Sequence, residues 1–305
     1  MEKADITAEL VTRLVAEQFP HWAGLRVRPV AQDGWDNATF HLGDHMSVRL
    51  PSADWYVPQV EKEQRWLPVL APQLPLPVPV PLAQGVPSAA FPRPWSVYQW
   101  LPGAHASAER IGDRVQFALD LANFLRALYG LDASAGPPAG RHSFNRGGAL
   151  AKFDTQTRAL IDELAADIDA AACQALWQSA LASRWQQTAV WVHGDISATN
   201  VLVRDGRLGA VIDFGCLAVG DPACDLVIAW TFLAGADAAA FRDRIAMDEA
   251  TWARARGWAL WKALLTHRDG IAAGTADKAG AQFGWRTDAR QLIAELCADA
   301  DRPAL

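Results

Sequence analysis

The spacing of apolar residues predicts a helix at the start of the chain and short strands after it. Residues 5–19 carry apolar side chains at helical spacing, and Pro20 ends the pattern. Residues 37–42 and 46–50 are β-prone segments on either side of a Gly-Asp turn pair, so they predict a hairpin. Residues 57–70 then predict a second helix with one apolar side.

Prolines crowd residues 68–94 and alternate with Leu and Val at 74–81. They disfavour helix and favour extended connections. An SH3-type ligand is one interpretation, but the alternation with apolar rather than polar residues favours a structured wall or an edge strand. Residues 95–101 predict a further strand, and we place a lobe boundary where it ends.

The remainder of the chain is predicted to be mainly helical. Ser107 can cap a helix whose apolar residues follow the helical period: Ile111, Val115, Leu119, Ala122 and Leu125. Further helices are expected within residues 148–187 and 225–298. One hairpin interrupts them, with strands at 201–203 and 208–212 around an Asp-Gly turn.

These elements predict an α+β fold with two lobes. We expect a small β-rich lobe over residues 1–101 and a larger, mainly helical lobe over residues 102–305. A chain of 305 residues is long enough for two such cores.

Composition narrows the functional classes. The formal charge of -6 argues against a nucleic-acid partner, because such binders concentrate Lys and Arg. The four cysteines form no C-x-x-C pair, which indicates neither a zinc site nor a disulfide framework and fits a reducing cytoplasm. We find no signal-peptide profile and no apolar stretch long enough to span a membrane, so we expect a cytoplasmic protein without membrane contact.

The most informative segment runs from Val192 to Asn200 as V-H-G-D-I-S-A-T-N, followed by I-D-F-G from Ile212 to Gly215. The predicted hairpin lies between them. Because its strands have similar lengths, Asn200 and Asp213 are expected at the same end of the ladder. Their oxygen atoms suit Mg²⁺, which usually completes its shell with water and nucleotide phosphates.

Asp195 precedes Asn200 on the same loop, so its carboxylate can point towards an incoming hydroxyl group. Phosphoryl transfer depends mostly on positioning and charge neutralisation, with one carboxylate that orients or deprotonates the hydroxyl. A lone His-Gly-Asp is commonly just a turn, and Asp213 could merely cap a loop. Their joint spacing on one hairpin favours the functional interpretation.

H-G-D-x-x-x-x-N followed by I-D-F-G resembles the aminoglycoside phosphotransferase family, within the protein-kinase-like superfamily. Protein kinases carry H-R-D-x-x-x-x-N and D-F-G with an activation segment afterwards. This chain passes almost directly to G-D-P-A-C-D-L at residues 220–226, a string similar to that of the small-molecule branch. The resemblance spans roughly residues 34–230. It argues against a protein substrate and implies a protein-kinase-like two-lobed fold.

The resemblance implies the roles of the catalytic loop. Asp195 would be the catalytic base, and His193 would brace the loop. Asn200 and Asp213 would bind Mg²⁺. Asp225 would anchor the loop from a helix start.

In the amino-terminal lobe the resemblance implies a phosphate-binding lysine, but this chain has Arg49 in its place. Arginine stays charged and can grip phosphate bidentately, although its geometry differs. Its partner would be Glu63, with Glu61 as a rival. The phosphate-covering loop would include Gly34 and Asn37.

The hinge that meets the adenine would be Gln99-Trp100-Leu101. The carboxyl-terminal segment is rich in tryptophan: Trp230, Trp252, Trp258, Trp261 and Trp285. These rings could stack on a flat ligand, but Trp at helical spacing usually packs a core.

The leading hypothesis is a kinase that transfers the γ-phosphate of ATP or GTP to a hydroxyl of a small molecule. Aminoglycosides are one acceptor class that the resemblance covers, with possible antibiotic resistance; macrolides, choline and homoserine are others. A nucleotide-binding relative that has lost transfer activity is the alternative, because Arg49 departs from the lysine pattern. Metal-dependent hydrolysis would need more His or Asp ligands than we find. The oligomeric state stays open.

Overall fold

The computed structural model describes residues 2–31 and 33–300 and forms two compact units. The first unit runs to Pro102 and also includes Ala210–Leu217. The second comprises Gly103–Gly209 and the chain from Ala218 onwards. The first unit thus ends beside the lobe boundary expected after residue 101. It also takes in a segment that the sequence pattern assigned to the second lobe.

The first unit is built on an antiparallel sheet of strand order β1-β2-β3-β5-β4. Its strands are β1 (Val27–Pro29), β2 (Asn37–Leu42), β3 (Met46–Pro51), β4 (Pro81–Gly85) and β5 (Trp95–Gln99). The predicted hairpin of residues 37–42 and 46–50 is confirmed, with Thr39 opposite Arg49. The expected edge strand of the proline-rich segment is confirmed as well, because β4 lies at the sheet edge.

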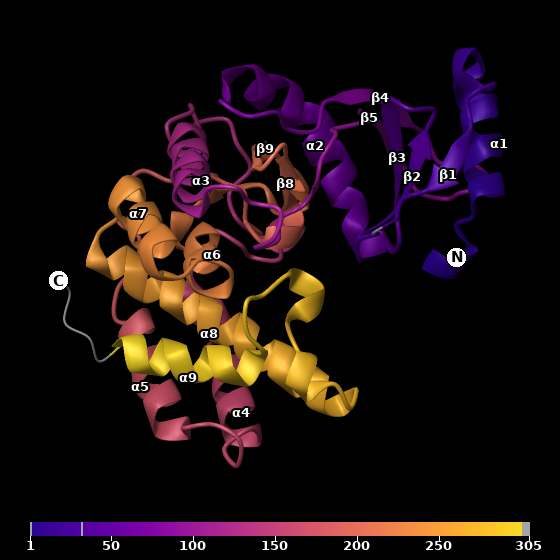
Figure 1. Cartoon of the computed structure of the whole chain (residues 1–305). Coiled ribbons are helices and arrows are strands. Elements are labelled where there is room, and N and C mark those ends of the chain that lie inside the picture. Colours follow the sequence, from indigo (N-terminus) through magenta and orange to yellow (C-terminus); the bar gives the residue numbers. More distant parts are fainter. Residues whose placement is uncertain (1, 32, 301–305) are drawn as a thin grey trace. The chain divides into compact units, whose positions relative to one another are not determined.

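Helices cover both faces of this sheet (Figure 1). Helix α1 (Ala8–Gln18) buries an apolar stripe in one core with the sheet: Leu10, Val11, Leu14 and Val15. The Thr7 side chain accepts a hydrogen bond from the Leu10 N–H at 3.3 Å and so begins the helix. Helix α2 (Val57–Leu70) contacts β4 and β5 and continues through Pro68 to its last turn.

The second unit is mainly helical. Its helices are α3 (Arg114–Tyr129), α4 (Asp154–Glu163), α5 (Ala170–Leu181), α6 (Ile228–Thr231), α7 (Gly235–Ile245), α8 (Glu249–Ala272) and α9 (Ala289–Ala300). A sheet of order β6-β8-β9 and a β7-β10 pair accompany them. The strands are β6 (Ala104–His105), β7 (Val190–Val192), β8 (Val201–Arg204), β9 (Arg207–Val211) and β10 (Ala218–Gly220). The chain passes into the first unit within β9, after Gly209.

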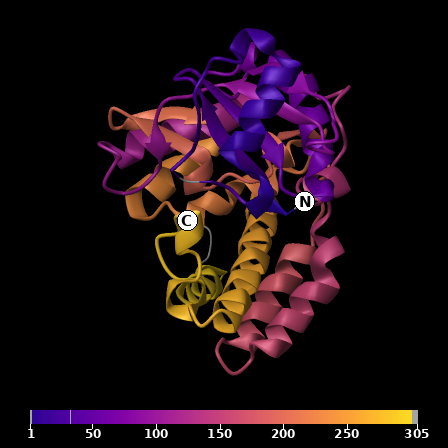
Figure 2. The same ribbon diagram turned by 90° about the vertical axis from the view of Figure 1, so that its right-hand side faces the viewer.

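Helix α8 is the central helix of this unit. It contacts α4, α5 and α9, which lie along it in both views (Figures 1 and 2). Asp248 begins the helix, since its carboxylate accepts the Thr251 N–H at 2.7 Å. Within the described part of the chain, no helix combines the length and apolar character needed to cross a bilayer.

The start of α3 corrects one prediction. The helix begins at Arg114 and is capped by Asp113, not by Ser107. Ile111 is buried but precedes the helix, while Val115 is exposed. The buried face is instead Phe117, Ala118, Leu121, Ala122, Phe124, Leu125 and Leu128. Ile111, an apolar residue of the preceding loop, matches the helical spacing by chance, so the predicted helix began too early.

The predicted α+β class is confirmed, with a small antiparallel-sheet unit and a mainly helical unit. The hairpin expected at residues 201–203 and 208–212 appears as the neighbouring strands β8 and β9. The tryptophans of the carboxyl-terminal segment are buried, as core packing requires: Trp230, Trp252, Trp258, Trp261 and Trp285.

Candidate active site

The catalytic-loop segment follows β7 and makes a sharp turn at Gly194. Gly194 has a φ of 86°, a left-handed conformation that favours glycine. The turn buries His193 completely, and its Nδ1 accepts the N–H of Asp195 at 3.2 Å. His193 therefore contacts the backbone at the centre of the loop, as a bracing residue would.

Asp225 lies in the short 3-10 segment Pro222–Val227 and is fully buried. Its carboxylate accepts the His193 N–H at 3.0 Å and the Gly194 N–H at 2.6 Å. The Tyr129 hydroxyl donates a third, longer bond of 3.4 Å. Burial raises the pKa of Asp225 to about 7, although the two backbone donors oppose that shift. The contacts are those of a loop anchor.

Asp195 and Asn200 contact each other within the loop. The Asn200 amide nitrogen donates to the Asp195 carbonyl at 2.9 Å and to its Oδ2 at 3.1 Å. This orients the Asn200 side chain and leaves its Oδ1 as the oxygen that it can offer to a metal.

Two cations that the sequence analysis missed lie beside Asp195. Lys262 of α8 donates to the Asp195 Oδ1 at 3.0 Å, and Arg146 comes from the loop before α4. Burial alone would raise the pKa of Asp195, but Lys262 and Arg146 lower it to about 2. The carboxylate is therefore ionised at neutral pH. The one signal for Lys262 was a charged residue within an apolar helical stretch.

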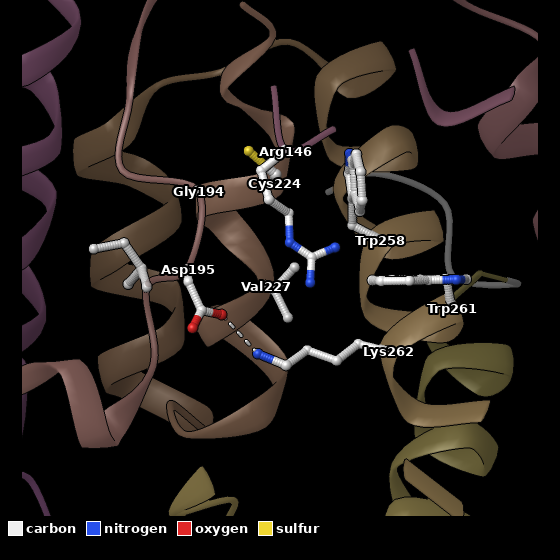
Figure 3. Close-up of a pocket in the computed structure, with 9 residues that line it drawn as sticks. Arg146, Gly194, Asp195, Cys224, Val227, Trp258, Trp261 and Lys262 are labelled. Carbon is white, nitrogen blue, oxygen red and sulfur yellow. Dashed lines mark hydrogen bonds and ion pairs between the residues drawn. The ribbon is translucent and has the colours of Figure 1, made fainter. Parts of the chain in front are cut away.

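These groups line a pocket (Figure 3). The Asp195 carboxylate and the Lys262 ammonium meet at its floor, and the Arg146 guanidinium points in beside the indoles of Trp258 and Trp261. The cavity between the lining residues has a volume of about 10 Å³, enough for about one water molecule. The space reaches about 260 Å³ only when the open side is counted. A ligand group would therefore enter from the open side and would not be enclosed.

The first unit holds a second charged group, around Arg49. Its Nη1 lies 3.5 Å from the Glu63 Oε1, and its Nη2 lies 3.2 Å from the Asp213 Oδ1. Burial disfavours the charged guanidinium, but Glu63 and Asp213 raise the pKa of Arg49 above its ordinary value. Of the two candidate partners on α2, Glu63 makes this ion pair, while Glu61 is exposed.

Glu63 is held from another side by Tyr98 of β5, whose hydroxyl donates to its Oε2. Burial raises the pKa of Glu63, and the charge of Arg49 opposes that change. The preceding residue, Lys62, is buried and donates to the Gly215 carbonyl at 2.7 Å. Burial lowers the pKa of Lys62 to about 8.

The I-D-F-G segment adopts a constrained backbone. Asp213 has a φ of 64°, a conformation that few residues other than Gly, Asn and Asp adopt. A Cβ atom at Gly215 would lie 2.8 Å from the end of the Gln59 side chain, so a larger residue would have to displace that side chain. Such strain is often concentrated at functional sites, where the surroundings enforce it.

The expected phosphate-covering loop connects β1 and β2. Gly34 accepts a hydrogen bond from Lys3 through its carbonyl, and Asn37 is buried at the start of β2. The expected hinge follows at the end of β5. There the Gln99 N–H donates to Val80 and the Trp100 N–H to His45, at 2.9 and 2.8 Å.

The structure thus forms two groups from the predicted site residues. Arg49, Glu63 and Asp213 contact one another in the first unit. His193, Asp195, Asn200 and Asp225 contact one another in the second. Asn200 and Asp213 belong to different units, so their meeting at one metal stays a prediction.

Magnesium is compatible with this donor set. Among residues 2–31 and 33–300, no cluster of three or more His, Cys, Asp or Glu residues is arranged to hold a metal ion. Mg²⁺ bound together with a nucleotide needs fewer protein ligands, since phosphates and water supply the rest. The Asp213 carboxylate and the Asn200 amide are oxygen donors of the kind that it prefers.

Comparisons with known proteins agree with the motifs. Solved structures match over nearly the whole chain. A complex of an APH(2")-type enzyme with GDP and kanamycin has 20% identity and a TM-score of 0.72, and the match covers 95% of this chain and 98% of that one. The GDP complex of an aminoglycoside 2'-phosphotransferase has 19% identity and a TM-score of 0.70, with 97% and 100% covered.

A macrolide 2'-phosphotransferase from Brachybacterium faecium matches at 22% identity and a TM-score of 0.59, covering 97% of this chain and 99% of that one. At these identities the likeness establishes the fold. No curated protein matches the chain. The profile of the phosphotransferase enzyme family matches residues 26–258, most of the chain, and confirms the predicted family and its phosphotransferase class. The chain belongs to the phosphotransferase enzyme family.

Proposed function

We propose that this protein transfers the γ-phosphoryl group of Mg-ATP or Mg-GTP to a hydroxyl of a small molecule. The observation that carries the proposal is the group in which Arg49 lies between Glu63 and Asp213, at 3.5 and 3.2 Å. A fixed cation suits a polyphosphate, and the adjacent carboxylate suits its metal. The GDP and ADP complexes of relatives support the nucleotide as co-substrate.

Asp195 is proposed as the catalytic base. Its pKa of about 2 makes it a weak proton acceptor in the ground state, so its main role is to orient the hydroxyl through a charge-assisted hydrogen bond. As the hydroxyl oxygen bonds to the γ-phosphorus, the bond from that phosphorus to the β–γ bridging oxygen breaks and the nucleoside diphosphate leaves, while the hydroxyl proton passes to Asp195. Its carboxylate lines a pocket with an open side, from which an acceptor hydroxyl would approach.

His193 and Asp225 are proposed as positioning residues for Asp195. Asp225 holds the two backbone N–H groups just before Asp195, and the His193 ring holds the N–H of Asp195 itself. A carboxylate fixed at both its backbone and its side chain keeps its orientation when the acceptor binds. Neither residue needs to contact the substrate.

Asn200 and Asp213 are proposed as the protein ligands of Mg²⁺. When bound, the metal would neutralise charge on the transferring phosphoryl group. Arg49 is proposed to contact the phosphates in place of the usual lysine, with Glu63 and Tyr98 fixing its position. Gly34 and Asn37 are proposed to lie along the phosphates.

The base of the nucleotide is proposed to bind at residues 99–101. The Gln99 and Trp100 N–H groups already have backbone partners. Recognition would therefore depend on the Gln99 carbonyl and on backbone groups beyond Trp100. Contacts through the backbone alone would allow ATP and GTP to bind with similar affinity.

The acceptor is proposed to be a small alcohol, with aminoglycosides, macrolides and metabolite alcohols as candidates. Relatives include a kanamycin complex and macrolide phosphotransferases. A cytoplasmic location is proposed because the nucleotide is found there, and the four cysteines, all within the described residues, form no disulfide. Nothing in the charge or fold favours a nucleic-acid partner.

A transfer assay tests the proposal. The protein is incubated with Mg²⁺, γ-labelled ATP or GTP, and panels of aminoglycosides, macrolides and small alcohols. We expect label to appear in at least one acceptor, and chelation of Mg²⁺ to abolish it. Nucleotide that binds without any turnover would favour the inactive relative. Failure to bind either nucleotide at millimolar concentration would contradict the proposal itself.

A further inference from the structure

The pocket beside Asp195 has an excess of positive charge. Asp195 is the one acidic side chain among the described residues that line it, and it faces both Lys262 and Arg146. The remaining titratable lining group is Cys224, whose thiol has a pKa raised by burial and is therefore neutral at physiological pH. One negative and two positive charges leave a net charge of about +1.

Arg146 is not neutralised by a partner of its own. Lys262 pairs with Asp195, but the buried Nη1 of Arg146 has no hydrogen-bond partner among the described residues. Leaving a buried charged donor unsatisfied is costly, so this N–H group requires an ordered water or a ligand to complete it.

The aromatic residues of the pocket determine which part of Arg146 a ligand can reach. Its guanidinium carbon lies 4.5 Å from the Trp261 ring centroid and 5.3 Å from that of Trp258. One side of the guanidinium faces the two indoles, and its remaining N–H donors are directed into the pocket (Figure 3). A planar edge of N–H donors matches the two oxygens of a carboxylate or phosphate.

The backbone holds Arg146 in this position. Phe144 and Asn145, immediately before it, both have left-handed φ values of 49° and 58°. Gly147 packs so closely that a Cβ atom would lie 2.9 Å from Val192, and its carbonyl accepts the Asp221 N–H at 2.8 Å. The strained, well-anchored loop therefore presents the guanidinium in one place, as a binding site requires.

We infer that the acceptor of this enzyme carries an anionic oxygen group, a carboxylate or a phosphate, which Arg146 binds while the acceptor hydroxyl meets Asp195. This inference rests on the proposed function and narrows its acceptor. Lys262 adds positive charge between the position of the anionic group at Arg146 and that of the hydroxyl at Asp195. A polycationic acceptor would place ammonium groups against two cations, which disfavours it.

The test compares matched benzylic alcohols that differ in one charged group: meta-(hydroxymethyl)benzoate, its amide, the corresponding benzylamine, and the analogous aryl phosphate. Binding to the full-length protein is measured by calorimetry. We expect an anionic member to bind about tenfold or more tightly than the amide, with the amine weakest. The benzoate and phosphate arms distinguish the two anionic groups. Equal or tighter binding of the amine, or no binding of either anion, would overturn the inference.

Substitutions of Arg146 test whether this residue causes the preference for anionic alcohols. Arg146→Gln should remove the preference for the anion, whereas Arg146→Lys should weaken it but keep its order. Arg141→Gln changes an exposed arginine of the same segment and should leave the preference intact. An unchanged preference in Arg146→Gln would refute the assignment. The wild-type comparison needs no variant, so it decides the matter even if Arg146→Gln does not fold.

Transfer measurements separate this inference from the proposed function. If anions bind through Arg146 but no acceptor is phosphorylated, the kinase proposal fails and the anion site stands. If a cationic acceptor is phosphorylated and Arg146→Gln leaves its kcat/KM unchanged, the anion site fails and the kinase proposal stands.

Discussion

The two units of the molecule each contain a charged group, and the two groups have opposite compositions. In the first unit, one guanidinium, Arg49, lies between the carboxylates of Glu63 and Asp213. In the second, one carboxylate, Asp195, faces the cations of Lys262 and Arg146. The three named side chains of the first group sum to a negative charge and those of the second to a positive charge, while Lys62 lies close to the first group and Asp225 close to the second.

The difference indicates which molecule each group is suited to bind. A net negative group with an exposed carboxylate attracts a metal ion, and its guanidinium can still contact phosphate oxygens. The Asp213 side chain is 33% exposed, whereas that of Glu63 is 5% exposed, so Asp213 is the available ligand. The net positive group attracts an anion and keeps its own carboxylate ionised. Substitutions that remove one charge from either group test this contrast.

The largest effect is expected for Asp195→Asn. Loss of the base should lower kcat by about 10²–10⁴-fold, because an amide neither accepts the proton nor carries the charge. Nucleotide affinity should stay within about twofold, since Arg49 and Asp213 lie in the other group and the Asn200 side chain keeps its bond to the Asp195 carbonyl. Transfer assays and nucleotide calorimetry measure the two quantities. Near wild-type phosphorylation of the true acceptor would refute the base assignment.

Asp205→Asn is the matched control for this substitution. Asp205 lies in the β8–β9 turn with a side chain 90% exposed, and its φ of 52° is one that Asn also adopts. Both kcat and nucleotide affinity should remain unchanged.

Asp213→Asn should act on the metal-bound nucleotide itself. An amide without the negative charge is a weaker ligand for the metal. Mg-nucleotide affinity should therefore fall about tenfold or more, which corresponds to the loss of one charge-assisted contact. Asn tolerates the left-handed backbone at this position, whereas Asp213→Ala would add strain to the same loss. Calorimetry with and without Mg²⁺ separates metal-dependent binding from the remainder. Equal affinity of wild type and variant in Mg²⁺ would show that Asp213 is not a ligand.

Asp44→Asn controls for loss of a negative charge in the first unit. Asp44 is 84% exposed in the β2–β3 turn. Its substitution should leave Mg-nucleotide binding unchanged.

The local parts of the site could be predicted from the sequence. Asp195 and Asn200 lie five residues apart on one loop, so their contact follows from the motif alone. The Arg49–Glu63 pair was also predicted, because the family that the sequence resembles pairs a residue of this strand with a glutamate of the next helix. Short-range geometry and recurring motifs supply this information.

The rest depends on long-range packing that a single sequence does not contain. Lys262 follows Asp195 by 67 residues and reaches it only because α8 runs through the centre of its unit. Arg146 comes from a loop with no recognisable pattern. Helical periodicity also cannot tell a buried loop residue from a helical one, which is why Ile111 misplaced the start of α3.

Arg49→Lys is expected to have a moderate effect. The guanidinium contacts Glu63 and Asp213 through different nitrogens, and a single ammonium cannot reproduce both contacts. The positive charge remains, so we expect kcat/KM to fall about tenfold with activity retained. An inert variant would show a specific need for guanidinium. Arg28→Lys, at an exposed ion pair with Asp44, should have no effect.

The smallest effect on kcat at neutral pH is expected for Lys262→Gln. The effect of this substitution should instead be seen in the pH dependence of kcat. Although burial opposes this change, Lys262 and Arg146 lower the pKa of Asp195 from 3.8 to about 2. Protonation of Asp195 therefore does not limit wild-type activity above about pH 4. In Lys262→Gln the effect of burial on Asp195 is less strongly opposed, so the pKa of Asp195 rises. The acidic limb of the kcat profile should therefore move to higher pH.

The Asp195–Lys262 ion pair should also make the stability of the fold depend on pH. The ion pair stabilises the fold at pH values above the unfolded pKa of 3.8, and this contribution is lost as the pH falls towards 2. The difference in unfolding free energy between wild type and Lys262→Gln should therefore shrink as the pH falls. Urea unfolding from pH 6 to pH 3 measures it, with the exposed Lys278→Gln as control. If the kcat limb of Lys262→Gln stayed with that of Lys278→Gln, the Lys262 ammonium would not control the charge of Asp195, and the positive character of this group would rest on Arg146 alone.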